Sequence, residues 1–457
     1  MYVSRIRVQD IKSFHGPREV DLTLTRPDGS HAGWTVLAGR NGSGKTTLLR
    51  AMALALSGPA VARSLVPAFA DWVTQGLALG RVEVEITRDA TYDLPAGNYD
   101  LGRHLKAGLV WEVPLNRGLP SLHSIQYDEP YIASPVLGPW ADNPEGWFCA
   151  GYGAFRRMAG GSGEVQRLML ASGPVARQAT LFHEDASLAE GVAWLIEQHL
   201  RALERKTGAP SLKAYALALL TDGLLPDGYR IMDVDSDGLW VERDGSYFPL
   251  RAMSDGFRTV AALVVDILKQ LHDVFGAGLW ASDRWEARGR SIALVTPGVV
   301  IIDEIDAHLH VSWQRRIGSW LTSHFPNIQF IVTTHSPYIC QSADPGGLIR
   351  LPGVDEERPP EVVSEALYQR VVYGSGDDAA LSDLFGLDSP YSEQAERKRG
   401  ELVALEMDIL RGQADEETVE RHRSLKRLLT SSSSARLDET AAQLKRLADE
   451  VRDGDGE

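Results

Sequence analysis

The segment that most constrains the fold is a glycine-rich loop at residues 39–46, with the pattern Gly-x-x-x-x-Gly-Lys-Thr. It follows a short apolar run, Trp34–Ala38, and precedes an apolar stretch at 48–56 that has almost no polar face. The first run predicts a buried central strand, and the second predicts a helix that is buried on nearly all sides. Backbone N–H groups of a glycine loop in this position surround a phosphate. The sequence therefore predicts a site for a nucleoside triphosphate.

Individual residues of this loop have separate expected roles. The residues expected to bind the nucleotide are Gly39, Arg40, Asn41, Gly42, Ser43, Gly44, Lys45, Thr46 and Thr47. Lys45 is expected to neutralise charge on the β- and γ-phosphates, and Thr46 to place its hydroxyl on Mg²⁺. A chance glycine turn is the alternative, and the flanking strand and helix argue against it.

A second apolar run, residues 299–302, ends in two carboxylates, Asp303 and Glu304. This pattern resembles a Walker B strand, in which the first carboxylate holds Mg²⁺ through water and the second polarises the attacking water. An acidic pair that only caps a strand is the alternative. The phosphate loop in the same chain favours Asp303 as a metal-site residue and Glu304 as a catalytic residue.

Two further motifs indicate the subclass of ATPase. His335 follows another apolar run and resembles the switch histidine of ABC-type ATPases, which contacts the γ-phosphate. This resemblance implies that His335 acts in catalysis with Glu304 and Lys45. Residues 253–257, Met-Ser-Asp-Gly-Phe, resemble the ABC signature Leu-Ser-Gly-Gly-Gln, with Ser254 and Gly256 at the positions that reach the nucleotide. A histidine that caps a strand and a simple helix N-cap are the respective alternatives.

The four motifs follow the order of the ABC-type ATPases, which the chain resembles. Residues 8–14 and 302–310 are similar to the SMC/RecF/OLD-like branch of prokaryotic AAA-family ATPases, and residues 151–157 and 181–182 to the ATPases of Septu-type antiphage defence. The resemblance implies an α/β fold. We expect a P-loop NTPase of ABC-ATPase type with a mixed or parallel sheet core, an inserted mostly helical region and a C-terminal helical extension.

The resemblance also implies how the chain works. In ABC-type ATPases the signature completes the site of another protomer, so we expect ATP and Mg²⁺ between two chains in a homodimer or higher homo-oligomer. Nucleotide-driven dimerisation is expected to gate a separate effector protein, a nuclease, in antiphage defence. A RecF-like DNA-binding repair ATPase and an ATP-bound structural scaffold remain as alternatives.

Several residues depart from the family pattern. Asp255 stands where the signature usually has glycine, which adds a negative charge near the γ-phosphate unless its side chain points away. No glutamine is obvious at a Q-loop position, and Tyr152, Arg156 and Gln166 remain as candidates. Residues 345–457 lack the acidic motifs of a TOPRIM nuclease, so no nuclease activity is expected in this chain.

The motif positions predict four parts. Residues 1–90 form the N-terminal lobe of the ATPase core with the phosphate loop, and residues 91–228 form an insertion or helical lid. Residues 229–350 form the C-terminal lobe with the signature, the acidic pair and His335, and residues 351–457 form a C-terminal helical region. Within the C-terminal lobe, residues 276–297 are rich in glycine, tryptophan and arginine and predict a surface loop.

Composition limits the compartment and the partners. Two cysteines far apart and no apolar run of about eighteen residues indicate a cytoplasmic protein without a membrane span. A formal net charge of -15 excludes a surface that is basic all over. Nucleic acid remains possible, because the loop carrying Arg284, Arg288, Arg290, Trp280 and Trp285 mixes cations with aromatic rings, although a plain surface loop is the simpler interpretation.

Overall fold

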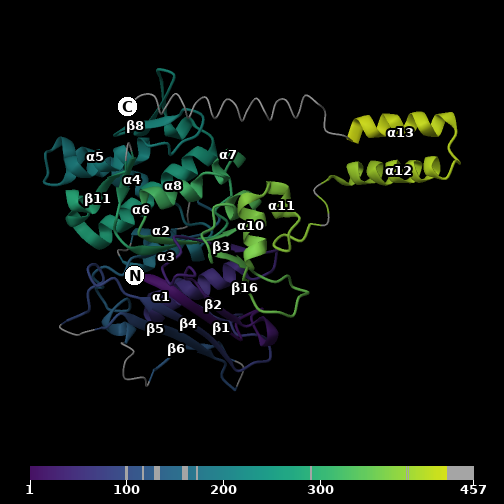
Figure 1. The fold of residues 1–457 in the computed structure, drawn as a ribbon. Coiled ribbons are helices and arrows are strands. Elements are labelled where there is room, and N and C mark those ends of the chain that lie inside the picture. The colour runs from purple at the N-terminus through teal and green to yellow at the C-terminus, as the bar shows by residue number, and fades with distance from the viewer. Residues whose placement is uncertain are drawn as a thin grey trace. The chain divides into compact units, whose positions relative to one another are not determined.

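The apolar run before the phosphate loop forms strand β3 (Trp34–Ala38), which lies inside a six-stranded sheet (Figure 1). In spatial order the sheet contains β16 (Glu361–Val362), β15 (Leu348–Arg350), β3, β14 (Ile328–Thr334), β13 (Gly298–Ile302) and β7 (Cys149–Tyr152). All strands except β16 run parallel. Their carboxyl ends therefore meet at one edge, which brings together motifs that are far apart in sequence.

The computed structural model describes residues 1–97, 101–115, 118–127, 134–156, 163–170, 173–288, 291–387, 389 and 391–429. By their internal contacts these residues form two units, residues 1–386 and residues 387–457. The expected division into four parts stays a prediction. Residues 351–386, which we expected to begin the C-terminal helical region, are part of the first unit.

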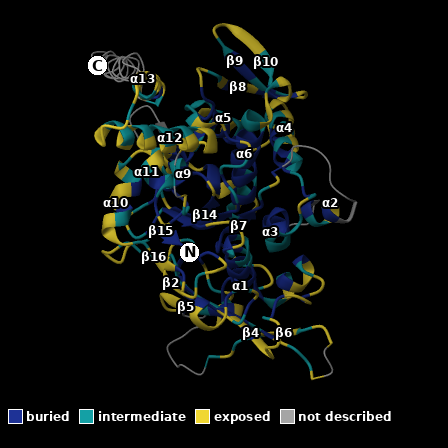
Figure 2. Ribbon diagram, turned by 90° about the vertical axis from the view of Figure 1, so that its right-hand side faces the viewer, coloured by how far each residue is buried: buried dark blue, intermediate teal, exposed yellow. Residues whose placement is uncertain are grey.

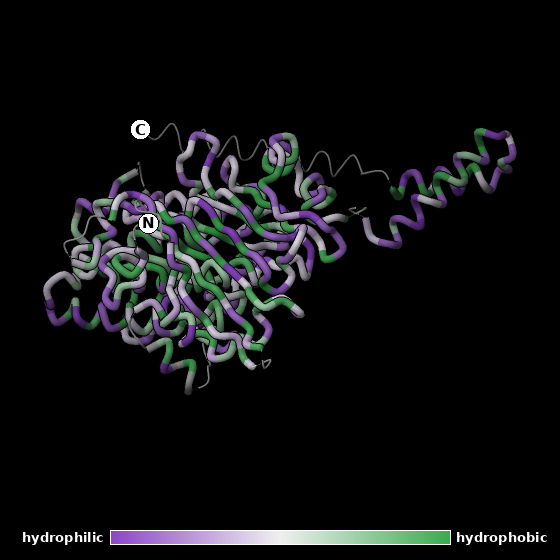
Figure 3. Tube along the Cα trace, turned by 90° about the horizontal axis from the view of Figure 1, so that it is seen from below, coloured by the Kyte–Doolittle hydropathy of each residue, from purple (hydrophilic) through white to green (hydrophobic). Residues whose placement is uncertain are grey.

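A second, antiparallel sheet forms most of the N-terminal part. Its order is β2 (Val20–Thr23), β1 (Tyr2–Gln9), β4 (Leu79–Thr87), β5 (His104–Glu112) and β6 (Ser121–Ser124). Inward apolar residues alternate with outward polar ones, as the changing colours along these strands show (Figure 3). Helix α1 (Lys45–Leu65) belongs to the same hydrophobic cluster as this sheet and one face of the central sheet. Burial between the two sheets explains why α1 has almost no polar face (Figure 2).

Helices cover the other face of the central sheet. Val300 of β13 belongs to a cluster with α6 (Asp255–Phe275), whereas its neighbour Val299 faces the cluster of α1. This alternation is the period of two that a strand buried on both faces requires. The remaining helices of this layer are α4 (Ala189–Leu203), α5 (Ala209–Thr221), α7 (Val311–Gln314), α8 (Ile317–His324) and α9 (Pro337–Cys340).

The middle of the chain is helical only in its second half. Residues 91–156 add β5 and β6 to the N-terminal sheet and β7 to the central sheet, and helices begin with α2 (Gly163–Leu170) and α3 (Pro174–Phe182). The expectation of a mostly helical insertion was therefore wrong for its first half. Hydrogen bonds to the preceding strand β4 and to the distant strand β13 determine β5 and β7, and local periodicity does not reveal such partners.

After residue 228 the chain forms a β-meander of β8 (Arg230–Asp235), β9 (Gly238–Arg243) and β10 (Ser246–Pro249). Short 3₁₀ helices complete the first unit: η1 (Gly16–Arg18), η2 (Pro135–Leu137), η3 (Leu250–Ala252), η4 (Gly276–Trp280) and η5 (Ser282–Arg284). The first unit ends with α10 (Glu365–Tyr373) and α11 (Gly376–Ala380). Within the described residues, no helix is long and apolar enough to cross a membrane.

The segment expected as a surface loop at 276–297 is instead folded against the core. It contains β11 (Trp285–Arg288) paired with β12 (Ser291–Leu294), and the side chains of Trp280 and Trp285 are 5% and 8% exposed. The Trp285 ring stacks on Tyr215, with ring centroids 4.8 Å apart. These aromatic faces are used internally and do not support a nucleic-acid contact. Arg290 and the side chain of Arg288 lie outside the described residues.

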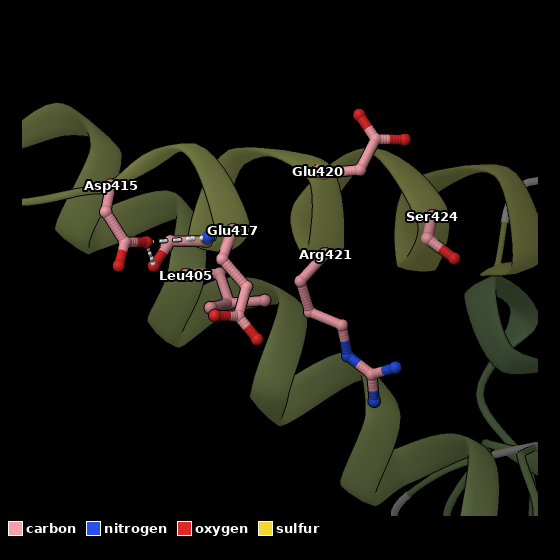
Figure 4. Close-up of a pocket in the computed structure, with 7 residues that line it drawn as sticks. Leu405, Asp415, Glu417, Glu420, Arg421 and Ser424 are labelled. Atoms are coloured by element: carbon pink, nitrogen blue, oxygen red, sulfur yellow. Dashed lines mark hydrogen bonds between the residues drawn. The ribbon is translucent and has the colours of Figure 1, made fainter.

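The second unit contains a pair of helices, α12 (Glu393–Leu410) and α13 (Glu416–Leu429), which confirms the two helices expected there. Arg421 of α13 donates to the Glu401 carboxylate of α12 over 2.7 Å. Figure 4 shows the open groove beside this pair, where Asp415 caps the start of α13 by accepting a hydrogen bond from the Thr418 amide at 2.8 Å. The remainder of the region expected to be helical, residues 430–457, lies outside the described residues.

Candidate functional site

The phosphate loop requires glycine at two positions with positive φ. Gly42 and Gly44 have φ values of 77° and 95°, in the left-handed region. A Cβ atom at Gly44 would also lie only 2.5 Å from Cζ of Phe14. Phe14, from the turn after β1, therefore packs directly under the loop. Backbone shape and close packing together explain why the motif has glycine immediately before Lys45.

Lys45 is buried beneath the loop with 6% exposure. Its ammonium donates to the Gly39 and Arg40 carbonyl oxygens at 2.8 and 3.1 Å. Burial lowers the pKa of Lys45, and the nearby acidic groups act against this effect. The buried hydroxyl of Ser43 has no hydrogen-bond partner within the described residues. An anionic ligand would suit these groups, because the Lys45 ammonium has only neutral carbonyl acceptors and the Ser43 hydroxyl has no partner.

The Asp303 carboxylate links three segments of the sheet edge. Thr46 donates to its Oδ2 at 2.8 Å, and Thr333, at the end of β14, donates to its Oδ1 at 2.5 Å. The Thr333 hydroxyl also accepts the Glu304 amide at 2.7 Å. The Thr46 hydroxyl and an Asp303 oxygen thus lie side by side next to the phosphate loop. Two such oxygens suit Mg²⁺, which takes few protein ligands and fills its remaining positions with water and phosphate oxygens.

A cavity of about 350 Å³ opens over the loop and contains both remaining catalytic candidates, Glu304 and His335. Its lining from the loop consists of Asn41, Gly42, Ser43, Gly44, Lys45, Thr46 and Thr47. Burial and, next, the Lys45 charge lower the pKa of His335, so its imidazole is neutral at pH 7. The structure therefore brings the phosphate loop, the acidic pair and His335 into one site. Gly39 and Arg40 contribute through their carbonyl oxygens below the loop.

Lys12 and Ser13 also line this cavity, although they were not among the expected site residues. Lys12 has a φ of 51°, and its ammonium lies 5.5 Å from the centroid of the Trp72 ring. Burial lowers the pKa of Lys12, and the nearby Arg50 charge lowers it further. Lys12 belongs to residues 8–14, whose similarity to related ATPases was visible in the sequence. Only the fold shows that the turn containing Lys12 faces the phosphate loop.

The structure places Ser254 and Gly256 in a different cavity, of about 400 Å³, at the start of α6. The same cavity is lined by Pro226, Asp227, Asp255, Phe257, His308, Leu309, His310 and Trp313. Ser254 occupies the N-cap of α6, but its hydroxyl makes no capping hydrogen bond. Asp255 forms an ion pair with Arg258 and thereby has a cationic neighbour for its charge. Among the described residues of one chain, the signature and the phosphate loop line two different cavities.

The structure describes the side-chain contacts of two of the three Q-loop candidates, Tyr152 and Arg156. The Tyr152 hydroxyl donates to Asp266 of α6 at 2.9 Å, and burial raises the pKa of that carboxyl to about 6. Arg156 donates to backbone carbonyls of the segment after β13, including that of Glu304 at 3.1 Å. The side chain of Gln166 lies outside the described residues.

Replacing Thr333 by valine should destabilise the site edge. The substitution removes a buried hydroxyl that joins Asp303 to the Glu304 amide, and it leaves both without that partner. Loss of a buried hydrogen-bonded group costs about 1–3 kcal/mol. Urea unfolding at pH 7 should therefore show a lower free energy of unfolding for Thr333→Val.

Thr35→Val is the matched control. Thr35 lies in the neighbouring strand β3 and is equally buried, but its hydroxyl has no hydrogen-bond partner. Its replacement should leave the free energy of unfolding unchanged or raise it slightly. Equal effects of the two substitutions would contradict the assigned network.

Parts of the chain match known protein families. Residues 205–341 match the protein family "AAA domain, putative AbiEii toxin, Type IV TA system", and residues 5–89 match the family "AAA domain". The Septu protein PtuA of Bacillus mycoides (strain KBAB4) is 26% identical over 339 residues, which cover 74% of this chain and 38% of PtuA. The Retron Ec83 probable ATPase of Escherichia coli is 34% identical over 129 residues, which cover 28% of this chain and 22% of that protein.

A solved structure of an SMC head bound to the C-winged helix domain of ScpA aligns with a TM-score of 0.45 and 16% identity. The alignment covers 79% of this chain and 98% of that one. The chain spans less than half the length of the curated relatives that it matches. The sequence matches show that this chain contains AAA-family domains and is homologous to Septu protein PtuA and to the retron probable ATPases.

Proposed function

We propose that this chain binds ATP with Mg²⁺, hydrolyses it, and uses nucleotide-driven dimerisation to gate a partner nuclease in antiphage defence. The observation that carries the proposal is the cavity over the phosphate loop. Its lining joins the phosphate loop to Glu304, and the Asp303 carboxylate accepts the hydroxyl of the lining residue Thr46, while Ser254 and Gly256 line a second cavity. The first cavity has the groups that phosphoryl transfer to water needs, and the second has groups that suit a nucleotide phosphate.

ATP and Mg²⁺ have identifiable positions in this proposal. The loop amides and Lys45 bind the phosphates, and the Lys45 ammonium exchanges its carbonyl partners for phosphate oxygens. Thr46 and Asp303 hold Mg²⁺, which supplies positive charge against the phosphate oxygens when it is bound. Thr333 fixes the Asp303 carboxylate, so the metal-site oxygen is oriented before the ligand arrives.

Glu304 and His335 have the catalytic roles. The Glu304 carboxylate lines the cavity next to the loop and accepts a proton from the attacking water as a general base. His335, which is neutral at pH 7, donates an N–H to an oxygen of the γ-phosphate. Its backbone is fixed by the Asp306 carboxylate, which accepts the His335 amide at 3.3 Å and the Thr334 hydroxyl at 2.5 Å.

Dimerisation follows from the position of the signature residues. The unused Ser254 hydroxyl and the start of α6 form an anion-binding surface that the phosphate loop of the same chain does not share. A second chain brings its own ATP to this surface. Because binding of two ATP molecules closes the pair and hydrolysis opens it, the pair has two states that a partner can detect.

Hydrolysis is tested with two variants. Wild-type protein should turn over ATP in a Mg²⁺-dependent reaction. Lys45→Ala should lose nucleotide binding, whereas Glu304→Gln should still bind ATP but turn over about 10²-fold or more slowly, because it lacks the general base. A phosphate-release assay and a fluorescent ATP analogue measure the two properties.

Glu197→Gln is the matched control, because Glu197 is a 62%-exposed carboxylate on α4 that forms only a surface ion pair with Arg201. Its turnover should equal that of the wild type. A Glu304→Gln variant with wild-type turnover would contradict the mechanism. Stable ATP binding without any turnover in the wild type would instead support the structural scaffold.

The gated partner is tested by affinity purification of the tagged chain from its native cells, with and without ATP. The proposal predicts a co-purifying nuclease whose retention changes between wild type and Glu304→Gln. Homology to Septu protein PtuA and to the retron probable ATPases supports this expectation. Co-purification of bare DNA without a protein partner would contradict it and favour the RecF-like alternative.

A further inference from the structure

Arg156 lies buried beneath the segment that follows β13, with 3% of its surface exposed. Its guanidinium donates to the carbonyl oxygens of Gly153 and Asp303, each at 3.0 Å. The other terminal nitrogen donates to the carbonyl oxygens of Glu304 at 3.1 Å, Ile305 at 3.2 Å and Ala307 at 3.3 Å. One side chain therefore binds four carbonyl groups of the segment that contains the catalytic candidate.

The backbone of this segment has an unfavourable conformation. Glu304 and His308 have φ values of 46° and 67°, although neither is glycine. Such residues persist only where their surroundings fix them. The carbonyl groups of residues 303, 304, 305 and 307 also converge, so their negative ends lie close together. A planar cation with several N–H groups can satisfy them at once, whereas a lysine ammonium has three donors at a single point.

Arg156 is itself held from the opposite side. It follows β7, where the Tyr152 carbonyl accepts the Asp303 amide at 2.8 Å. The Thr180 hydroxyl of α3 donates to the Gly151 carbonyl at 2.9 Å, and a Cβ atom at Gly153 would lie 2.3 Å from the Thr180 carbonyl oxygen. The segment before Arg156 is thus packed against α3. The backbone that carries Arg156 is therefore fixed by α3 as well as by the segment that the guanidinium binds.

The charge of Arg156 is retained in the interior. Burial lowers its pKa to about 10, and the nearby carboxylates of Asp306, Asp303 and Glu304 act against this effect. The side chain is therefore still a cation at pH 7.

We infer that Arg156 is a positioning residue for ATP hydrolysis, whose guanidinium holds residues 303–307 in the conformation that presents the Glu304 carboxylate to the phosphate-loop cavity. This inference rests on the proposed role of Glu304 as the general base. Arg156 does not line the cavity, so it acts through the backbone and not through contact with ATP. Within the described residues, Arg156 makes no hydrogen bond to the phosphate loop.

The inference predicts a loss of turnover without a loss of nucleotide binding. Arg156→Ala should lower kcat about 10²-fold, as expected when a general base is misplaced, while the Kd for a fluorescent ATP analogue changes less than about threefold. Arg156→Lys keeps the positive charge but loses the planar arrangement of several N–H donors. Its kcat should therefore lie between those of Arg156→Ala and the wild type. Millimolar guanidinium should restore part of the activity of Arg156→Ala.

Two comparisons separate positioning from general stabilisation. In the Glu304→Gln background, Arg156→Ala should lower kcat much less than in the wild type, because its effect passes through Glu304. Arg177→Ala is the matched control, since Arg177 is a 7%-exposed arginine on α3 with no hydrogen bond to residues 303–307. Its kcat should stay near the wild-type value, and guanidinium should not change it.

Wild-type kcat in Arg156→Ala would overturn the inference, as would equal losses of kcat and ATP binding without rescue by guanidinium. If Arg156→Ala does not fold, Arg156→Lys decides, and a wild-type kcat in that variant contradicts the assignment. Absence of turnover in the wild-type protein would instead refute the proposed function, so the two failures are distinguishable.

Discussion

The candidate site depends on the two hydrogen bonds that the Asp303 carboxylate accepts. One oxygen accepts the Thr46 hydroxyl at the start of α1, and the other accepts the Thr333 hydroxyl at the end of β14. Three segments separated by up to 287 positions in sequence, 46 to 333, are thereby joined at one sheet edge. The contact is possible because β3, β14 and β13 are parallel neighbours whose carboxyl ends coincide. The same arrangement places Glu304 and His335 over the phosphate loop.

In our proposal this arrangement gives the chain two separate surfaces for phosphate. The phosphate loop lies at the end of β3, whereas Ser254 and Gly256 lie at the start of α6 and in a different cavity. Each surface lies at a helix N-terminus, which suits an anion: the Ser43 hydroxyl has no hydrogen-bond partner within the described residues, and the Ser254 hydroxyl makes no capping hydrogen bond. Our proposal assigns each to a different partner in a pair of chains. Arg156 then adds a buried cation that fixes the catalytic segment from below.

Sequence alone predicted the parts of the site that are local. The phosphate loop, its strand Trp34–Ala38 and the run before Asp303 are visible because a glycine pattern or an apolar run is complete within ten residues. The strands β5, β6 and β7 were missed because their identity depends on hydrogen bonds to partner strands, which for β7 lie about 150 positions away in the chain. Trp280 and Trp285 were interpreted as loop residues, although stacking and burial place them in the core. The role of Arg156 was hidden because its partners are backbone carbonyls, which no side-chain motif records.

The central claim is that one chain supplies only half of a working ATP site. Mixing Lys45→Ala with Ser254→Arg in equal amounts tests it directly by ATP hydrolysis. Each variant alone should be inactive, because every site lacks either its phosphate loop or its signature. In the mixture, half of the pairs contain both variants and one of their two sites is intact, so about a quarter of the wild-type rate should return. A mixture as inactive as its components, or full turnover by Ser254→Arg alone, would contradict the account.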